Sequence, residues 1–249
     1  MPGTVTTTAD ALTIQRLGFH RSGRMIVLVG AVHSAPPAFW AATQAYLEGF
    51  EVAGGAVHYE GTRQKSRHTP STWLKHRLVL AQTTALRETF AKLGFVWQTP
   101  DGIRYHDSWE NHDTDGVHVL RNLRLWKLLI SSTVARTLLR RTRTRARNAV
   151  LISFLSVLGT PAGPSADDST LLDERNELAI AAALTADRDV ALLWGTGHLS
   201  GMAELLLAEG FDLVWRDDVE YVTREHLSQY GIDYDDMIAA RTTRAKERQ

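Results

Sequence analysis

Two continuous apolar runs predict strands that are buried on both faces of a sheet. Residues 25–29 (Met-Ile-Val-Leu-Val) precede Gly30, and residues 190–194 (Val-Ala-Leu-Leu-Trp) precede Gly195. A short apolar run without polar alternation is typical of a central strand that helices cover on both sides. One run lies near each end of the chain, so we expect both ends to contribute to one sheet.

Helical periodicity alternates with further strand patterns around these runs. The tandem prolines at 36 and 37 suit the start of a helix. The other predicted elements are helices at 38–49, 171–185 and 201–209 and strands at 54–60 and 211–215. Strands that alternate with helices form βαβ units. The chain is therefore predicted to be an α/β protein.

The middle of the chain, about 70–160, is predicted to be a helical insertion, and the whole chain to be one domain. Apolar residues recur at helical spacing over 72–93, and Gly94 suits a stop. In a second helical zone at 121–148, every charged residue is basic. A loop rich in Pro, Gly and Ser at 160–169 marks a boundary of the insertion.

The basic zone allows two interpretations. Its arginines at 136, 140, 143 and 147 share one helical face, which can lie on an anionic membrane surface or bind RNA. The alternative is a solvated stripe, or one that pairs with the acidic segments 217–218 and 235–236 of a partner in a homodimer. We favour the alternative, because nothing else in the sequence indicates nucleic acid.

The composition excludes several classes of site. The 249 residues include no cysteine, which excludes disulfides, cysteine zinc sites, iron–sulfur clusters and thiol nucleophiles. The 28 basic and 28 acidic residues balance, so no overall charge attracts nucleic acid. The sequence lacks a Gly-x-Ser-x-Gly elbow and a P-loop motif. Any metal site must therefore use His, Asp or Glu.

Hydropathy gives no sign of a membrane protein. The apolar stretches are shorter than the roughly 18–20 residues that span a bilayer. Residues 1–10 lack the basic and apolar regions of a secretory signal. We therefore expect a cytoplasmic protein without a transmembrane segment.

The main candidate chemistry is a pair of histidines at matching positions. Gly30-Ala-Val-His33 and Gly195-Thr-Gly-His198 each continue a buried strand, and Glu60 ends another predicted strand. Ligands of open α/β sheets bind beyond the carboxyl ends of the strands. Two imidazoles and a carboxylate are typical of a catalytic divalent metal, for which Mn, Co, Fe and Zn are all admissible. The same residues also fit a metal-free site in which a histidine is the general base. A third interpretation is that each histidine only caps a helix or hydrogen-bonds to a carbonyl.

Other polar residues are weaker candidates. The stretch 105–113 is rich in potential ligands and can supply an acid such as Asp113, or it is a solvent-facing loop whose Trp109 packs on the core. His58 precedes Glu60 by two residues, so strand alternation places both on one face. His58 is then either a group near the substrate or a packed histidine.

These motifs together resemble the TraB/PrgY/Tiki family. The resemblance rests on Gly30-Ala-Val-His33, on Glu60 with Arg63 close behind it, on Asp173-Glu-Arg-Asn176 at a helix start, and on Gly195-Thr-Gly-His198-Leu-Ser-Gly201. The last segment, with the amphipathic helix that leads to Gly210-Phe211, is the most specific. The matching regions are about 25–65 and 170–216, and the middle matches poorly.

The resemblance implies an erythromycin-esterase-like or haem-binding ChaN-like α/β fold and, in the Tiki branch, a divalent-metal-dependent protease. It implies that the metal lies between His33, His198 and Glu60. Arg175 is then an oxyanion anchor, or the ion-pair partner that orients Glu60. The sequence lacks the membrane anchor of Tiki and PrgY, so a membrane-protein substrate is not expected.

The sequence therefore predicts a metal-dependent hydrolase that cleaves an amide or ester bond in a peptide or small molecule. Glu60 or Glu174 is the expected proton acceptor, and Arg175 steadies the oxyanion. The residues expected at the substrate are Gly30, Arg63, Gly195 and Gly197. The alternatives are a metal-free, esterase-like hydrolase, a module that binds haem or a peptide, and a regulator that acts through the basic zone.

Overall fold

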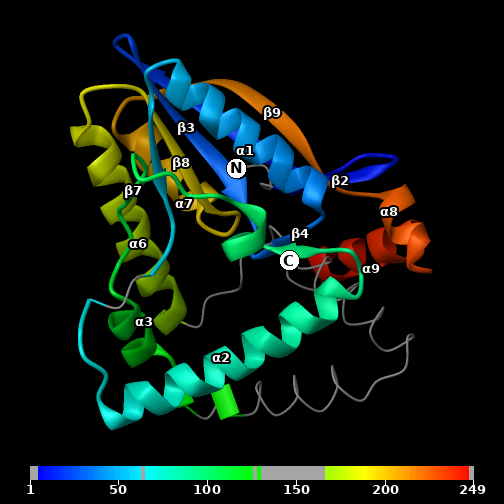
Figure 1. Cartoon of the computed structure of the whole chain (residues 1–249). Coiled ribbons are helices and arrows are strands. Elements are labelled where there is room, and N and C mark those ends of the chain that lie inside the picture. The colour runs from blue at the N-terminus through cyan, green and yellow to red at the C-terminus, as the bar shows by residue number, and fades with distance from the viewer. Residues whose placement is uncertain (1–4, 63–64, 126–127, 130–165, 247–249) are drawn as a thin grey trace.

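A computed structural model describes residues 5–62, 65–125, 128–129 and 166–246. These residues form a mixed α/β structure with a central sheet (Figure 1). The strands are β1 (Val5–Thr7), β2 (Ala11–Arg21), β3 (Arg24–Ala31), β4 (Ser34–Ala35), β5 (Ala56–Tyr59), β6 (Val96–Trp97), β7 (Glu110–Asn111), β8 (Val190–Gly195) and β9 (Asp212–Thr223). The helices are α1 (Pro37–Val52), α2 (Pro70–Ala91), α3 (Gly116–Asn122), α6 (Ala166–Thr185), α7 (Leu199–Ala208), α8 (Arg224–Gln229) and α9 (Tyr234–Lys246), with a short segment η1 (Gln98–Gly102).

The order of the strands joins distant parts of the chain. The central sheet runs β1-β2-β3-β8-β5-β7, and β9 also pairs with β2. The strands β3, β8, β5 and β7 are parallel to one another, whereas β2 is antiparallel to β3 and β9. The carboxyl ends of four parallel strands therefore meet at one edge of the sheet.

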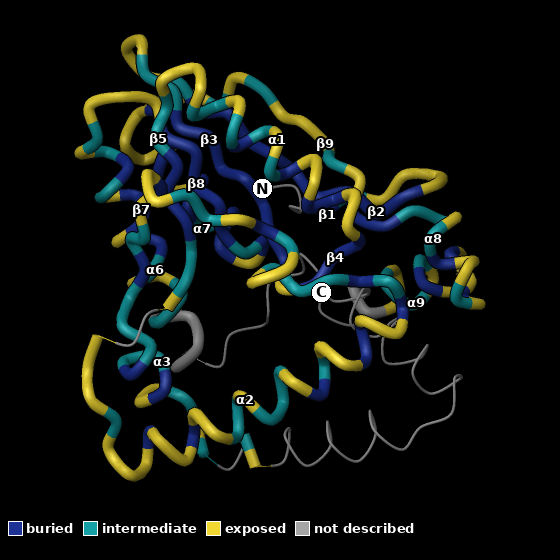
Figure 2. Tube along the Cα trace, viewed as in Figure 1, coloured by how far each residue is buried: buried dark blue, intermediate teal, exposed yellow. Residues whose placement is uncertain are grey.

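Two apolar cores lie on the two faces of this sheet. Alternate residues of β3 divide between them: Val27 and Val29 join the core that includes α1, and Ile26 and Leu28 join the core that includes α6 and α7. This alternation is the period of two that a strand imposes on its side chains. Figure 2 shows β3, β5 and β8 buried between the helices. The continuous apolar sequence of β3 thus follows from helices on both faces.

Local signals fix several boundaries. Ser22 and Gly23 join β2 to β3 as a two-residue turn in which both residues have positive φ, 51° and 81°. Such a turn matches the twist of the paired strands, and glycine adopts it without steric cost. Pro37 begins α1, and the side chain of Thr69 caps the backbone of Thr72 at the start of α2.

The structure confirms that both ends of the chain build one sheet, and it adds strands that the apolar pattern does not show. β2 is not among the predicted strands, and β9 continues to Thr223, well beyond the predicted end at 215. β7 lies within the segment 70–160, so this segment contributes a strand to the sheet as well as helices. Most of the basic zone, and the loop at 160–169 up to residue 165, lie outside the described residues.

In the part of the chain that the structure describes, no helix combines the length and the apolar character that a membrane crossing requires.

Candidate functional site

Four residues with acid–base side chains follow the four parallel strands at the same edge of the sheet. His33 follows β3 by two residues, Glu60 follows β5 directly, Asp113 follows β7 by two residues, and His198 follows β8 by three. This edge is where open α/β sheets place their ligands. The sheet therefore places the strand-end histidines and Glu60 as the sequence predicts, and it adds Asp113.

Arg175 of α6 joins two of these strand ends. Its Nε and Nη2 donate to the two carboxylate oxygens of Asp113 at 2.8 and 2.7 Å, and Nη2 also donates to Oε1 of Glu60 at 2.6 Å. The side chains of Arg175, Glu60 and Asp113 are 12, 17 and 0% exposed. A bidentate contact fixes the guanidinium plane as well as its position. Arg175 therefore orients Glu60, one of the two roles expected for it.

Gly195 holds the other oxygen of Glu60. Its backbone N–H donates to Oε2 at 2.6 Å, and a Cβ at this position would lie 3.0 Å from the same oxygen. The glycine thus lets the carboxylate approach the backbone at the end of β8. Both oxygens of Glu60 accept hydrogen bonds, so the carboxyl group is held in place.

His198 lies in the same network, with one ring nitrogen fixed by α6. Its Nδ1 lies 2.7 Å from Oδ1 of Asn176, and because an amide oxygen only accepts, Nδ1 carries the proton. Its Nε2 lies 3.6 Å from Oε1 of Glu60. A Cβ at Gly201 would lie 2.5 Å from Nδ2 of Asn176, so the glycine of α7 makes room for this amide.

Burial and charge act in opposite directions at this site. Burial lowers the pKa of His198, while the nearby carboxylate of Glu60 raises it and Arg175 lowers it, and the net pKa lies below the usual histidine value. Burial also lowers the pKa of Arg175, but the hydrogen bonds and charges of Asp113 and Glu60 outweigh burial, so its pKa is raised. At neutral pH the resting site combines a neutral imidazole with a permanent guanidinium.

The other predicted site residues that the structure describes take no part in the hydrogen bonds and ion pairs described above. His33 is exposed, and its ring stacks on Trp97 with centroids 6.0 Å apart. Glu174 points elsewhere: it is half exposed and pairs with His118 at 3.1 Å. Gly197 is exposed, with no atom within 4 Å of an added Cβ.

Gly30 and Arg63 are the last two residues that the sequence predicts at the substrate. Gly30 lies inside β3, where a Cβ would be 2.5 Å from Cγ2 of Ile14, so the close packing of β2 explains the glycine. Arg63 lies outside the described residues.

The metal that the resemblance implies does not fit the side chains as they lie. The donor atoms of His33, Glu60 and His198 do not all lie within 4.8 Å of one another, as the donor atoms of a metal site would. Glu60 already binds Arg175 and Gly195 through both oxygens. Metal binding at this edge would require the donor atoms of these three residues to move closer together.

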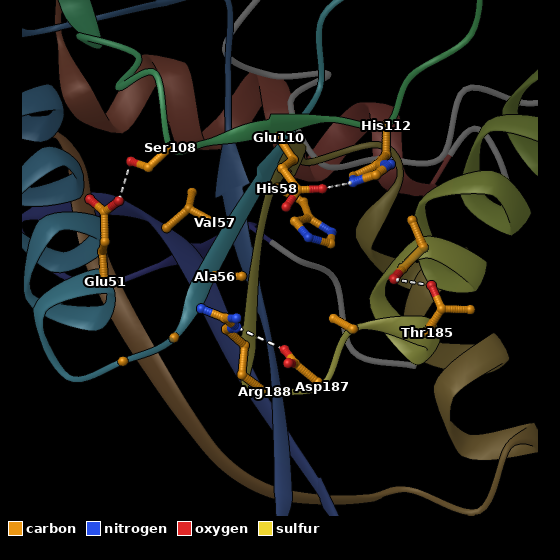
Figure 3. A pocket seen from close by; sticks show the side chains of 14 residues that line it. Glu51, Ala56, Val57, His58, Ser108, Glu110, His112, Thr185, Asp187 and Arg188 are labelled. Atoms are coloured by element: carbon orange, nitrogen blue, oxygen red, sulfur yellow. Dashed lines mark hydrogen bonds and ion pairs between the residues drawn. The ribbon is translucent and has the colours of Figure 1, made fainter.

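A different group of residues can hold a metal ion. His58, Glu110 and His112 each place a donor atom within 4.8 Å of the others. They line a pocket of about 370 Å³ between β5, β7 and the end of α6 (Figure 3). The interpretation of 105–113 as a ligand-rich stretch thus applies to Glu110 and His112 as well as to Asp113.

Asn176 and Glu110 are not among the residues to which the sequence pattern assigns a role. Asn176 belongs to the Asp-Glu-Arg-Asn block, and its position next to Arg175 on a helix was the available signal. Glu110 and His112 are two residues apart, so on a strand they share a face.

Comparisons with protein-family models, with curated proteins and with solved structures find no match for this chain.

Proposed function

We propose that the chain is a hydrolase of ester or amide bonds in which His198 is the general base. The observation that carries the proposal is the arrangement of His198: Nδ1 is fixed on Asn176, and Nε2 faces the anchored carboxylate of Glu60 at 3.6 Å. A neutral imidazole with one oriented N–H and one available lone pair is the form that accepts a proton from water. A TraB-like or erythromycin-esterase-like fold remains part of this proposal.

Each residue of the network then has a role that follows from its contacts. His198 removes the proton of a water that attacks the carbonyl carbon of the substrate, and it later returns this proton to the leaving group. Glu60 stabilises the imidazolium that forms, because its carboxylate is close and cannot turn away. Arg175 and Asn176 are positioning residues: the first fixes Glu60, and the second fixes the tautomer and plane of His198.

The exposed residues at the same edge define where a substrate approaches. His33 and Gly197 are exposed, whereas His198 and Asp113 are buried. The open space at Gly197 lets a substrate backbone or acyl group come close to the end of β8. A peptide or small ester is therefore expected to lie across His33 and Gly197.

A metal-dependent hydrolase of the Tiki type is the second candidate. The charges at the site favour it: two carboxylates, Glu60 and Asp113, face one guanidinium, and a bound cation would balance the excess negative charge. The donor atoms are not grouped for an ion, which is why we place this candidate second.

The test is an activity screen of the purified, untagged chain on nitrophenyl esters of increasing acyl length and on fluorogenic peptides. Glu60→Gln and His198→Gln should each lower kcat/KM by roughly 10²–10⁴-fold. Glu174→Gln is the matched control, since Glu174 is a neighbouring acid outside the network, and it should retain activity within about twofold.

A chelator separates the two candidates. Activity that persists in EDTA and 1,10-phenanthroline supports the metal-free mechanism. Activity that is lost with chelator and restored by Mn²⁺, Co²⁺ or Zn²⁺ supports the metal-dependent one. A screen in which His198→Gln is as active as the wild type on every substrate refutes both.

A further inference from the structure

We infer that His58, Glu110 and His112 form a binding site for a divalent transition-metal ion, separate from the strand-end network. One donor atom from each residue lies within 4.8 Å of the other two. Two imidazoles and one carboxylate are a frequent ligand set for zinc and its neighbours in the first transition row.

The strand pairing brings these three residues together. β5 and β7 are parallel, with His58 opposite Glu110 in register, and His112 follows Glu110 by two residues. Strand alternation places all three side chains on one face of the sheet. His112 and Glu110 are in contact, with Nε2 2.8 Å from Oε2, and the rings of His58 and His112 have centroids 4.3 Å apart.

A second observation points to a missing ligand. His58 is only 2% exposed, and its Nδ1 is buried with no hydrogen-bond partner among the described residues. A buried polar atom without a partner costs free energy, and most such atoms in proteins are satisfied. His58 lines the same pocket of about 370 Å³ as Glu110 and His112 (Figure 3), which leaves space for an ion and its water ligands.

The charged neighbours of the pocket limit the strength of the site. Arg188 lines the pocket and lies close enough to Glu110 for their charges to interact, and it pairs with Asp187 at 2.9 Å. The cation of Arg188 opposes a second cation, while Asp187 offsets it. Because the set has a single carboxylate ligand and neutral imidazoles, it favours Zn²⁺ or Co²⁺ over the hard ions Mg²⁺ and Ca²⁺.

An ion here would add a further link between β5 and the short edge strand β7, beside the hydrogen bonds that Trp109 and Asn111 already make. β7 has two residues and pairs only with β5 among the described strands. Asp113, which binds Arg175, follows this strand by two residues and comes directly after His112. A metal that ties His58 of β5 to Glu110 and His112 would therefore also hold Asp113 in place.

The test is titration of the untagged, chelator-stripped full chain with Zn²⁺ by calorimetry, and with Co²⁺ by visible absorption. We expect one Zn²⁺ per chain, d–d absorption bands with Co²⁺, and a melting temperature that rises by about 5–10 °C at a hundredfold excess over Kd. Glu110→Ala and His112→Ala should weaken binding by roughly 10–100-fold or more. Both side chains are partly exposed, so circular dichroism should show an unchanged fold.

The matched control is the pair His118 and Glu174, a second exposed His–Glu contact, at 3.1 Å. His118→Ala and Glu174→Ala should bind Zn²⁺ as the wild type does. The inference is overturned if the wild type binds no Zn²⁺, or if Glu110→Ala and His112→Ala bind it unchanged. It is also overturned if His33→Ala with His198→Ala abolishes binding, a result that would instead favour the metal-dependent form of the proposed function. Loss of hydrolase activity alone leaves the metal inference standing.

Discussion

Replacing Arg175 by methionine should destabilise the protein strongly, because it leaves two carboxylates without their cation. Arg175 donates three hydrogen bonds of 2.6–2.8 Å to Asp113 and Glu60, whose side chains are 0 and 17% exposed. Removing one partner of a buried ion pair costs about 3–5 kcal/mol, since the remaining charge is neither solvated nor paired. We expect Arg175→Met to lower the free energy of unfolding by about this amount and the melting temperature by roughly 6–20 °C.

Urea denaturation followed by circular dichroism measures this loss. Arg104→Met is the matched control: Arg104 also pairs with a carboxylate, Glu48 at 2.8 Å, but it is 76% exposed, so its loss should leave the unfolding midpoint close to that of the wild type.

A triple variant isolates the charge as the cause. Adding Glu60→Gln and Asp113→Asn to Arg175→Met removes both buried anions, and it should recover part of the lost stability. The reasoning is refuted if Arg175→Met loses less than about 1 kcal/mol, or if the triple variant is less stable than Arg175→Met.

Three further predictions follow from single positions. Gly30→Ala should lower the free energy of unfolding by about 1–3 kcal/mol, because its Cβ would lie 2.5 Å from Cγ2 of Ile14. Gly197→Ala meets no atom within 4 Å and should be as stable as the wild type. Equal melting temperatures of the two variants would contradict this reasoning. Tyr221→Phe should lower the free energy of unfolding by about 1–3 kcal/mol, since the buried hydroxyl donates to a backbone carbonyl of β4 at 2.8 Å, and an unchanged urea midpoint would count against it. The acid limb of the pH profile of kcat/KM should lie below the ordinary histidine pKa of about 6.5, because burial lowers the pKa of His198; a limb at or above that value would exclude His198 as the base.

The sequence shows most clearly those strands that helices bury on both faces. β3 and β8 are continuous apolar runs, and their positions are predicted well. β2 is equally buried, yet its sequence includes Gln15 and Arg16. Arg16 is tolerated because it contacts Asp217 of β9 at 3.4 Å and lies over the ring of Tyr46 in α1. These partners lie far away in the sequence, so no local pattern could identify β2 as a central strand.

The candidate site shows the same division between local and distant signals. His33, Glu60 and His198 are predictable, because each follows a strand that the sequence itself indicates. The role of Asp113 depends on β7, a strand of only two residues that carries no periodic signal. Its partner Arg175 lies 62 positions further along the chain. Only the pairing of β7 with β5 shows that this acid faces the same network.

In the proposed mechanism, the charge balance of the network favours His198 as a general base. Burial keeps the resting imidazole of His198 neutral, so that Nε2 can accept a proton. Glu60 and Asp113 together exceed the charge of Arg175, so a proton that arrives on His198 restores neutrality. Burial thus keeps the imidazole neutral at rest, while the carboxylates offset part of the cost of charging it, and a general base needs both properties for proton transfer in the transition state. In the proposed mechanism, Arg175 holds Glu60 in place while Asp113 offsets the cation that would otherwise oppose this step.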